Sequence, residues 1–169
     1  GEAHFLRGLY YFNLVRLFGD VPWIDKQQTA SDDLQVSRTS KDIVYQHIID
    51  DFSDAASMLP AVYENTTDIG RATKGAAFGL LAKVYLTLKR YNETLVAIDS
   101  VMNLGVYSLN RKYEWNFSDL RENGPESLFE VQYEKDVTAY SEFDILGQGG
   151  WHHEYMAPLA SINIGGPWG

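Results

Sequence analysis

Four stretches of helical periodicity in the first 105 residues constrain the fold more than any other feature of the chain. In each stretch apolar side chains recur every three or four residues, which is the spacing of one face of an α-helix. The stretches cover residues 2–18, 39–59, 73–89 and 93–104. The sequence therefore predicts a mainly α-helical protein.

The ends of these helices carry recognisable signals. Residues 2–18 place apolar groups almost all round, and a helix of that kind is normally buried on several sides. Gly19 can adopt the left-handed conformation that ends a helix. Thr39, with Asp42 in a capping-box position, is expected to begin the second helix, and Thr73 to cap the third.

The third and fourth stretches are separated by a short break, which predicts an antiparallel helical hairpin. Residues 72–104 span about one unit of a ~34-residue repeat and resemble the tetratricopeptide pattern, with small Ala82 followed by Tyr85. Gly8 and Tyr11 repeat the small-then-Tyr spacing, so the first two helices are interpreted as a second, degenerate unit. Units of this kind stack and present surfaces to partners.

Helical periodicity stops after residue 105. Residues 106–109 and 127–133 have strand character, and the chain from residue 134 onward is rich in Gly and aromatic residues without a clear period. We therefore divide the chain into a tetratricopeptide-like helical region at 1–105 and a loop and strand region at 106–169. Both regions are expected to belong to one domain.

Charge and composition exclude several classes of protein. A formal net charge of −9 disfavours nucleic acid, and the chain has no Lys/Arg run to hold an anionic membrane surface. It has no apolar run of 18 residues and no cysteine for a disulfide or a thiolate metal site. The chain opens at Gly1 and Glu2 inside a helical pattern, so we expect it to be an internal piece of a longer protein.

The sequence offers no set of catalytic residues. His152 and His153 are adjacent and would point opposite ways in an extended segment, so no metal site is expected. Asp50, Asp51 and Asp54 are placed near the solvated face of the second helix and are interpreted as a charged surface. With no nucleophile elbow and no facing carboxylate pair, we predict a non-catalytic protein without a cofactor.

Aromatic side chains in the last third supply the candidate binding residues. Trp151, Tyr155 and Trp168 lie in a Gly-rich stretch, where flat rings can stack on the apolar faces of sugar rings. The alternative is that these rings pack against another part of the protein. Trp23, just after the first helix, is interpreted as structural.

Four blocks, in order along the chain, resemble the SusD/RagB family of nutrient-binding outer-membrane lipoproteins of Bacteroidetes. They are YFNLVRLFGDVP at 11–22, SRT at 37–39 with IIDDF at 48–52, GRATKGAA at 70–77 with LLAKVYL at 80–86, and ESLFEVQY at 126–133. The resemblance implies tetratricopeptide-like helix pairs that support a loop-rich region.

The same resemblance implies a function. Members bind glycans, or sometimes peptides, at the cell surface and act with a SusC-type TonB-dependent transporter in nutrient uptake. It implies an outer-membrane location through a lipid anchor outside residues 1–169, no catalysis and no cofactor. Glycan contacts vary within the family, so none is carried over residue by residue.

The sequence leaves three hypotheses about function. The first is glycan capture with a transporter, and the second is a helical protein-interaction scaffold without its own glycan site, or a peptide-binding member of the family. They differ in whether Trp151, Tyr155 and Trp168 are exposed or buried. A glycoside hydrolase, the third, lacks a candidate carboxylate pair.

Overall fold

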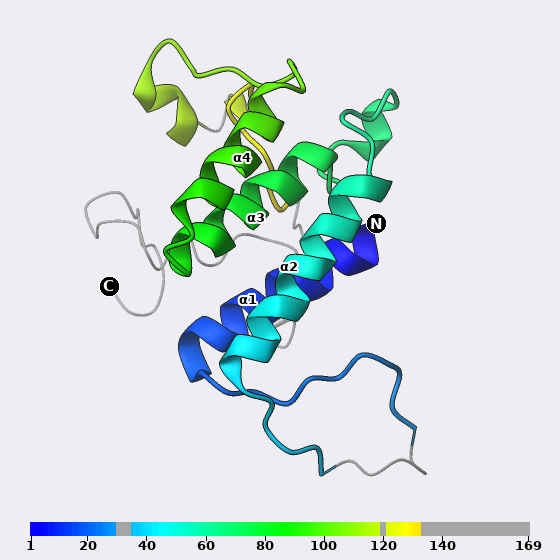
Figure 1. Ribbon diagram of the computed structural model, residues 1–169. Helices are drawn as coiled ribbons and strands as arrows, with labels where there is room; N and C mark the ends of the chain where they lie inside the picture. Colours follow the sequence, from blue (N-terminus) through cyan, green and yellow to red (C-terminus); the bar gives the residue numbers. More distant parts are fainter. Residues whose placement is uncertain (30–34, 119–120, 133–169) are drawn as a thin grey trace, which may run out of the picture. The chain divides into compact units, whose positions relative to one another are not determined.

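The computed structural model of the chain describes residues 1–29, 35–118 and 121–132 (Figure 1). Its elements are four α-helices and two short 3-10 helices: α1 (Glu2–Phe18), α2 (Lys41–Met58), η1 (Thr66–Asp68), α3 (Lys74–Thr87), α4 (Tyr91–Met102) and η2 (Tyr113–Phe117). The chain forms two compact units, residues 1–130 and 131–169, and the description below concerns the first.

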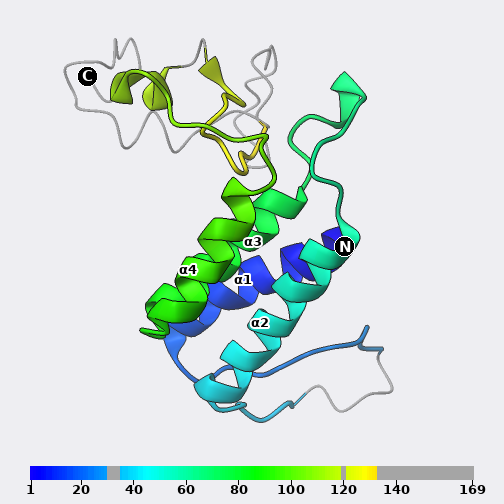
Figure 2. The same ribbon diagram turned by 45° about the horizontal axis from the view of Figure 1, so that its top comes forward.

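The four helices follow one another as antiparallel neighbours. Helix α1 packs against α2, α2 against α3, and α3 against α4, as both views of the ribbon show (Figures 1 and 2). The turn between α3 and α4 is tight because Lys89 adopts a positive φ of 60°. The predicted fold class, mainly α with tetratricopeptide-like helix pairs, is therefore confirmed.

Three phenylalanines, Phe5, Phe12 and Phe52, are the largest apolar side chains that are fully buried in the core. The rings of Phe5 and Phe52 meet edge to face with centroids 5.9 Å apart, an arrangement that suits their quadrupoles. A Cβ at Gly8 would lie 3.1 Å from the Phe52 ring. The small residue that the repeat pattern predicts in the first helix therefore brings α1 close to α2.

The face of α1 that points away from α2 is exposed, although the sequence predicts a helix that is buried on several sides. Tyr10, Leu17 and Phe18 are more than half exposed, and Leu6 and Leu14 are also exposed. In the described part of the chain, α1 packs on α2 and, over a short contact, on α3. Packing partners on one side account for burial on one side only.

Helix α2 begins at a different residue from the one that the sequence predicts. Gly19 has a φ of 70°, and its N–H donates to Val15 O, which ends α1 as expected. Thr39 does not begin α2, because its N–H pairs with Val21 O at 2.9 Å. The helix starts at Lys41, whose N–H donates to the Asp20 carboxylate at 2.8 Å. A carboxylate from the end of α1 thus replaces the local cap.

Helix α3 begins as the sequence predicts. The Thr73 hydroxyl accepts a hydrogen bond from the Ala76 N–H at 3.1 Å. The start of α3 is also tied to the end of α2, because Lys74 N–H donates to Pro60 O at 2.8 Å. The cap and the tie fix the position at which the loop after α2 rejoins the helices.

The two segments with predicted strand character do not form strands in the part of the chain that the structure describes. Residues 106–109 and 127–132 are irregular, and Tyr133 lies outside the described residues. The first segment is joined to the chain just before the second by the bond from Ser108 N–H to Pro125 O at 2.9 Å. Leu128 packs on α3 and Phe129 on Phe5 of α1, whereas Val131 is 62% exposed.

Two glycines on α3 receive the segment 106–130. A Cβ on Gly75 would lie 2.2 Å from the Tyr107 ring, and one on Gly79 would lie 2.5 Å from Leu128 Cδ1. The two glycines are four residues apart and so share one face of the helix. We call this face the glycine notches. Farther along, Phe129 reaches Phe5 with ring centroids 4.9 Å apart.

Candidate functional site

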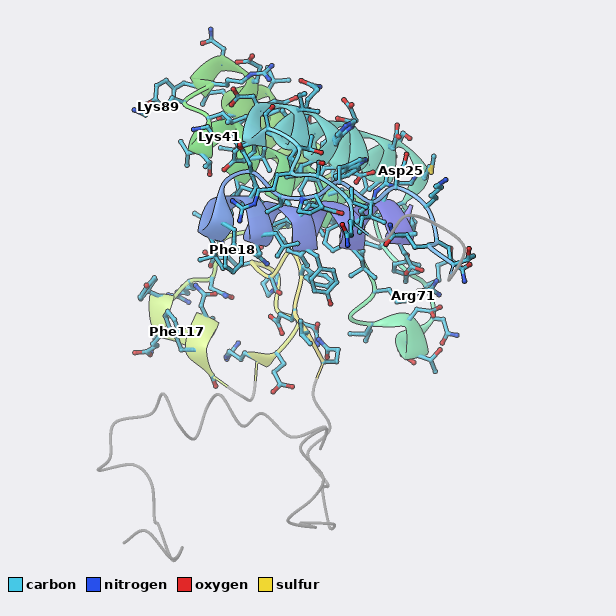
Figure 3. The ribbon with its side chains drawn as sticks, turned by 90° about the horizontal axis from the view of Figure 1, so that it is seen from below. Phe18, Asp25, Lys41, Arg71, Lys89 and Phe117 are labelled. Atoms are coloured by element: carbon cyan, nitrogen blue, oxygen red, sulfur yellow. The ribbon has the colours of Figure 1, made fainter. Side chains whose placement is uncertain are left out.

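A cleft of about 290 Å³ lies between the loop after α2 and the segment 106–130. We call it the loop cleft. Leu128 and Phe129 form part of its lining on one side, and Tyr63 and Arg71 on the other. Figure 3 shows Arg71 beside the loop that carries η1, on the same side of the helices as η2. The loop cleft therefore lies where the two non-helical parts of the unit face each other.

The Arg71 side chain holds one wall of the loop cleft in place. Its guanidinium donates to both carboxylate oxygens of Glu2, at 2.7 and 2.9 Å, and to Asp68 at 2.9 Å. It also lies over the Tyr63 ring, 5.1 Å from the centroid, and the Tyr63 hydroxyl donates to Ala72 O at 3.0 Å. The wall is thus pinned to the start of both α1 and α3.

The rim of the cleft is apolar, and the wall opposite Arg71 is fixed by a polar contact of Tyr107. The Tyr107 hydroxyl lies 2.9 Å from the Thr73 hydroxyl oxygen, so it is held at the start of α3. Val62, Ile69 and Val106 line the cleft and remain exposed. A mostly apolar concavity with a few fixed polar groups is the usual form of a small-molecule site.

The bond to Arg71 lowers the pKa of Glu2, so this ion pair gives stability a defined pH dependence. Because the folded pKa lies below the ordinary value, the stabilisation is present above the unfolded pKa and is lost as pH falls through the folded pKa. Glu2→Gln is expected to lower the free energy of unfolding at pH 7 by less than about 1 kcal/mol, since both partners are exposed.

Urea unfolding at pH 7 and at about pH 3 measures this effect. The wild type and Glu2→Gln should converge at the lower pH. Glu64→Gln removes an exposed carboxylate from the same loop and serves as the control. A difference for Glu2→Gln that persists unchanged at acid pH would contradict the assignment to the ion pair.

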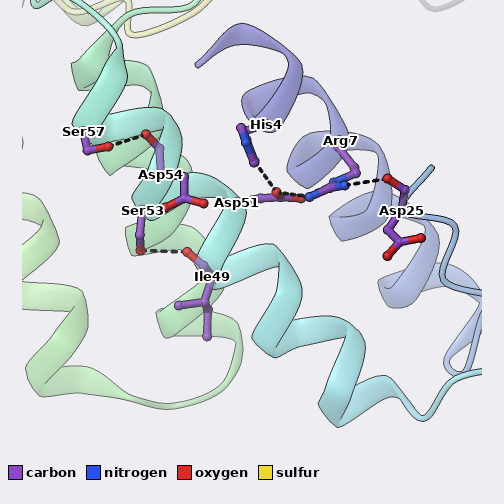
Figure 4. Close-up of polar contacts among 8 residues, drawn as sticks. All are labelled: His4, Arg7, Asp25, Ile49, Asp51, Ser53, Asp54 and Ser57. Carbon is purple, nitrogen blue, oxygen red and sulfur yellow. Dashed lines mark hydrogen bonds and ion pairs between the residues drawn. The ribbon is translucent and has the colours of Figure 1, made fainter. Parts of the chain in front are cut away.

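Asp51 requires a correction, because it is buried rather than solvated. Its side chain is 2% exposed. Arg7 Nε donates to Asp51 Oδ2 at 2.8 Å and Arg7 Nη2 to Oδ1 at 2.6 Å, while His4 Nδ1 lies 2.7 Å from Oδ1 (Figure 4). Asp50 and Asp54 are exposed, as expected. Asp51 was misplaced because its partners come from α1.

Arg7 also contacts the segment that follows α1. Its guanidinium lies 5.0 Å from the centroid of the Trp23 ring, and Trp23 stacks on His47 with centroids 4.4 Å apart. The Tyr11 hydroxyl accepts the Ile24 N–H at 2.8 Å. Trp23 packs against the core, so its structural interpretation is confirmed. These contacts link α1, α2 and the segment after α1.

The three aromatic residues predicted to bind a ligand, Trp151, Tyr155 and Trp168, lie outside the described residues, as do His152 and His153. Among the residues that the structure describes, no group of three or more His, Cys, Asp or Glu side chains could hold a metal ion. No helix in this part is both long and apolar enough to cross a bilayer. The predicted division at residue 105 stays a prediction.

Sequence reasoning missed the loop cleft for two reasons. Residues 63–70 lie between two predicted helices and carry no helical periodicity, although Tyr63 in that stretch is half-buried beside Arg71. The GRATKGAA block at 70–77 was the available signal, since it holds the Arg71 wall, the Thr73 cap and the first glycine notch. Its resemblance to a family indicated that the block matters but not which contact each residue makes.

The chain is similar to known proteins both in sequence and in fold. A SusD-like family model, described as starch-binding and associating with the outer membrane, matches residues 1–86. SusD-like protein P25 of Formosa agariphila is 25% identical over 93% of this chain and 32% of its own length. The chain thus spans about a third of the length of that curated relative.

Solved structures agree with this match. A SusD-like protein from Bacteroides fragilis superposes with a TM-score of 0.73 and 37% identity, covering 79% of this chain and 27% of the other. A laminarin-binding SusD-like protein gives a TM-score of 0.70 and 31% identity over 78% of this chain and 30% of the other.

Proposed function

This chain belongs to the SusD-like family, and from that premise we propose that its protein captures glycans at the outer membrane for uptake through a SusC-type TonB-dependent transporter. The observation that carries the proposal is the match of residues 1–86 to a starch-binding family model. The likeness to a laminarin-binding protein across 78% of the chain supports it further.

The proposed division of labour follows the two kinds of structure in the chain. Stacked helix pairs give a rigid support and can present a face to a protein partner, which in this proposal is the transporter. The loops carry the ligand contacts, as loops on rigid scaffolds commonly do. Attachment to the cell surface is proposed to use a lipid anchor outside residues 1–169. The protein is proposed to bind and hand over its ligand without chemical change.

Affinity electrophoresis of the complete protein and of residues 1–169 through gels that contain different polysaccharides tests the glycan part. Retardation of both by one polysaccharide places the binding site within these residues. Retardation of the complete protein alone places it elsewhere. Absence of retardation by any polysaccharide overturns glycan capture and leaves peptide ligands or a scaffold role. Co-purification with the transporter tests the partner.

The rings of Trp151, Tyr155 and Trp168 are proposed to contact the glycan. Trp151→Ala and Trp168→Ala are each expected to weaken binding by about tenfold, because a flat ring loses its stacking surface. Retardation in the gel measures binding, and circular dichroism checks the helices. Trp23→Ala removes a packed indole near the first helix and is the contrasting variant. If Trp151→Ala or Trp168→Ala loses helical signal instead, that ring is structural.

A further inference from the structure

A second, more polar concavity adjoins the loop cleft. Its volume is about 200 Å³, and it shares Gly124, Ser127 and Glu130 with the cleft. Asn110, Asn116, Arg121 and Glu126 complete its lining. We call it the polar pocket. Every residue of its lining belongs to the first compact unit.

Hydrogen bonds inside the polar pocket orient its planar groups. Asn110 N–H donates to Glu126 Oε2 at 2.8 Å, and Asn116 Nδ2 donates to the same oxygen at 3.1 Å. The Asn110 amide donates to Asn116 Oδ1. These bonds use one carboxylate oxygen of Glu126, and the other oxygen forms no hydrogen bond with the described residues. A fixed acceptor beside amide groups matches the paired hydroxyls of a sugar.

Two exposed aromatic rings lie on η2, the short helix that carries Asn116 of the polar pocket. Asn116 lies within η2 between Tyr113 and Phe117, whose side chains are 79% and 74% exposed. Figure 3 shows Phe117 on η2, away from the helix layer. The two rings lie edge to face with centroids 5.2 Å apart. Exposed flat rings beside oriented polar groups are the combination that grips the apolar face and the hydroxyl edge of a sugar.

The third aromatic of η2 is held differently. The Arg121 guanidinium covers the Trp115 ring at 3.7 Å from its centroid. Arg121 lines the polar pocket, and within the described residues no carboxylate forms an ion pair with it. The lining thus includes a guanidinium donor in Arg121 as well as the carboxylate acceptor of Glu126.

Charge selects the class of sugar. Residues 110–132 hold five carboxylates against three cationic side chains. An acidic neighbourhood repels uronate or sulfate groups, so it favours a ligand that carries hydroxyls alone.

We infer that the polar pocket, together with the exposed rings of Tyr113 and Phe117 on η2, is a binding subsite for a neutral oligosaccharide. This inference rests on the proposed function, and it adds a place and a ligand class to it. The subsite lies apart in sequence from Trp151, Tyr155 and Trp168, so the two sets of rings can be tested separately.

Isothermal titration calorimetry measures how tightly the complete protein binds oligosaccharides. The oligosaccharides come from the polysaccharide that retards the protein most in affinity electrophoresis. Tyr113→Ala and Phe117→Ala are each expected to weaken binding by about tenfold, as is Asn116→Ala. Tyr91→Ala removes an aromatic ring that is 60% exposed on α4 and is the matched control, with unchanged affinity expected. Circular dichroism of each variant should match the wild type.

Four outcomes overturn all or part of the inference. If Tyr113→Ala, Phe117→Ala and Asn116→Ala all bind with wild-type affinity, the polar pocket is not a binding subsite, although glycan capture itself is not contradicted. Equal losses in Tyr91→Ala show that the effect is not local. Stronger binding of polygalacturonate than of neutral polysaccharides overturns the ligand class. A wild-type protein that binds no glycan overturns both this inference and the proposed function.

Discussion

Asp51→Ala is expected to lower the free energy of unfolding by about 2–3 kcal/mol, because it leaves Arg7 and His4 without their shared acceptor. The carboxylate is 2% exposed and accepts two hydrogen bonds from Arg7. Removing one member of a buried ion pair commonly costs ~3–5 kcal/mol. Water reaches Arg7 and His4, which are 32% and 35% exposed, so part of that cost is recovered.

Urea-induced unfolding, followed by circular dichroism, measures this change. Asp50→Ala is the matched control, since Asp50 is the preceding residue of α2, is exposed and accepts a bond only from Gln46 among the described contacts. That variant should stay within about 0.5 kcal/mol of the wild type. Equal effects of the two substitutions would show that the buried cluster does not stabilise the α1–α2 pair.

Phe5→Ala is expected to have the larger effect, a loss of about 3–5 kcal/mol. Phe5 is fully buried and touches two rings, Phe52 from α2 and Phe129 from the segment 106–130. Its removal leaves a cavity where the helices and the loops meet. The segment 106–130 should therefore loosen along with the core.

Thermal unfolding measures the loss of stability, and limited proteolysis reports on the segment 106–130. Cleavage at Arg111, Lys112 or Arg121 by trypsin should be faster in Phe5→Ala than in the wild type. Phe18→Ala on the same helix removes a ring that is 66% exposed and should change neither measurement appreciably. Unchanged proteolysis in a destabilised Phe5→Ala would mean that Phe129 does not hold the loops.

Periodicity was enough to predict the helical part of the fold. It also indicated that Asp51 is buried, although the sequence analysis placed this residue near the surface. Asp51 follows Ile48 by three residues and precedes Ala55 by four, so it lies on the apolar stripe of α2. A carboxylate on such a stripe needs a partner. The partners, Arg7 and His4, are about 45 residues away, and local sequence patterns do not reveal a contact of that range.

The loops were less predictable for a related reason. An apolar alternation such as that in 127–133 indicates that one side is buried but not what covers it. Here the cover is a helix with glycine notches, and Leu128 fits where Gly79 has no side chain. The run from Tyr113 to Phe117 alternates aromatic and polar residues, which was the available sequence signal for the exposed rings on η2.

Tyr107 and Leu128 sit in the glycine notches of α3, and Phe129 rests against Phe5. These three side chains bracket residues 110–126, which include η2 and most of the polar pocket. Folding determinants and candidate ligand contacts thus occupy separate positions in the chain. Such a stretch can be exchanged as a cassette, so grafting residues 110–126 from a relative offers a route to new specificity on an unchanged helical frame.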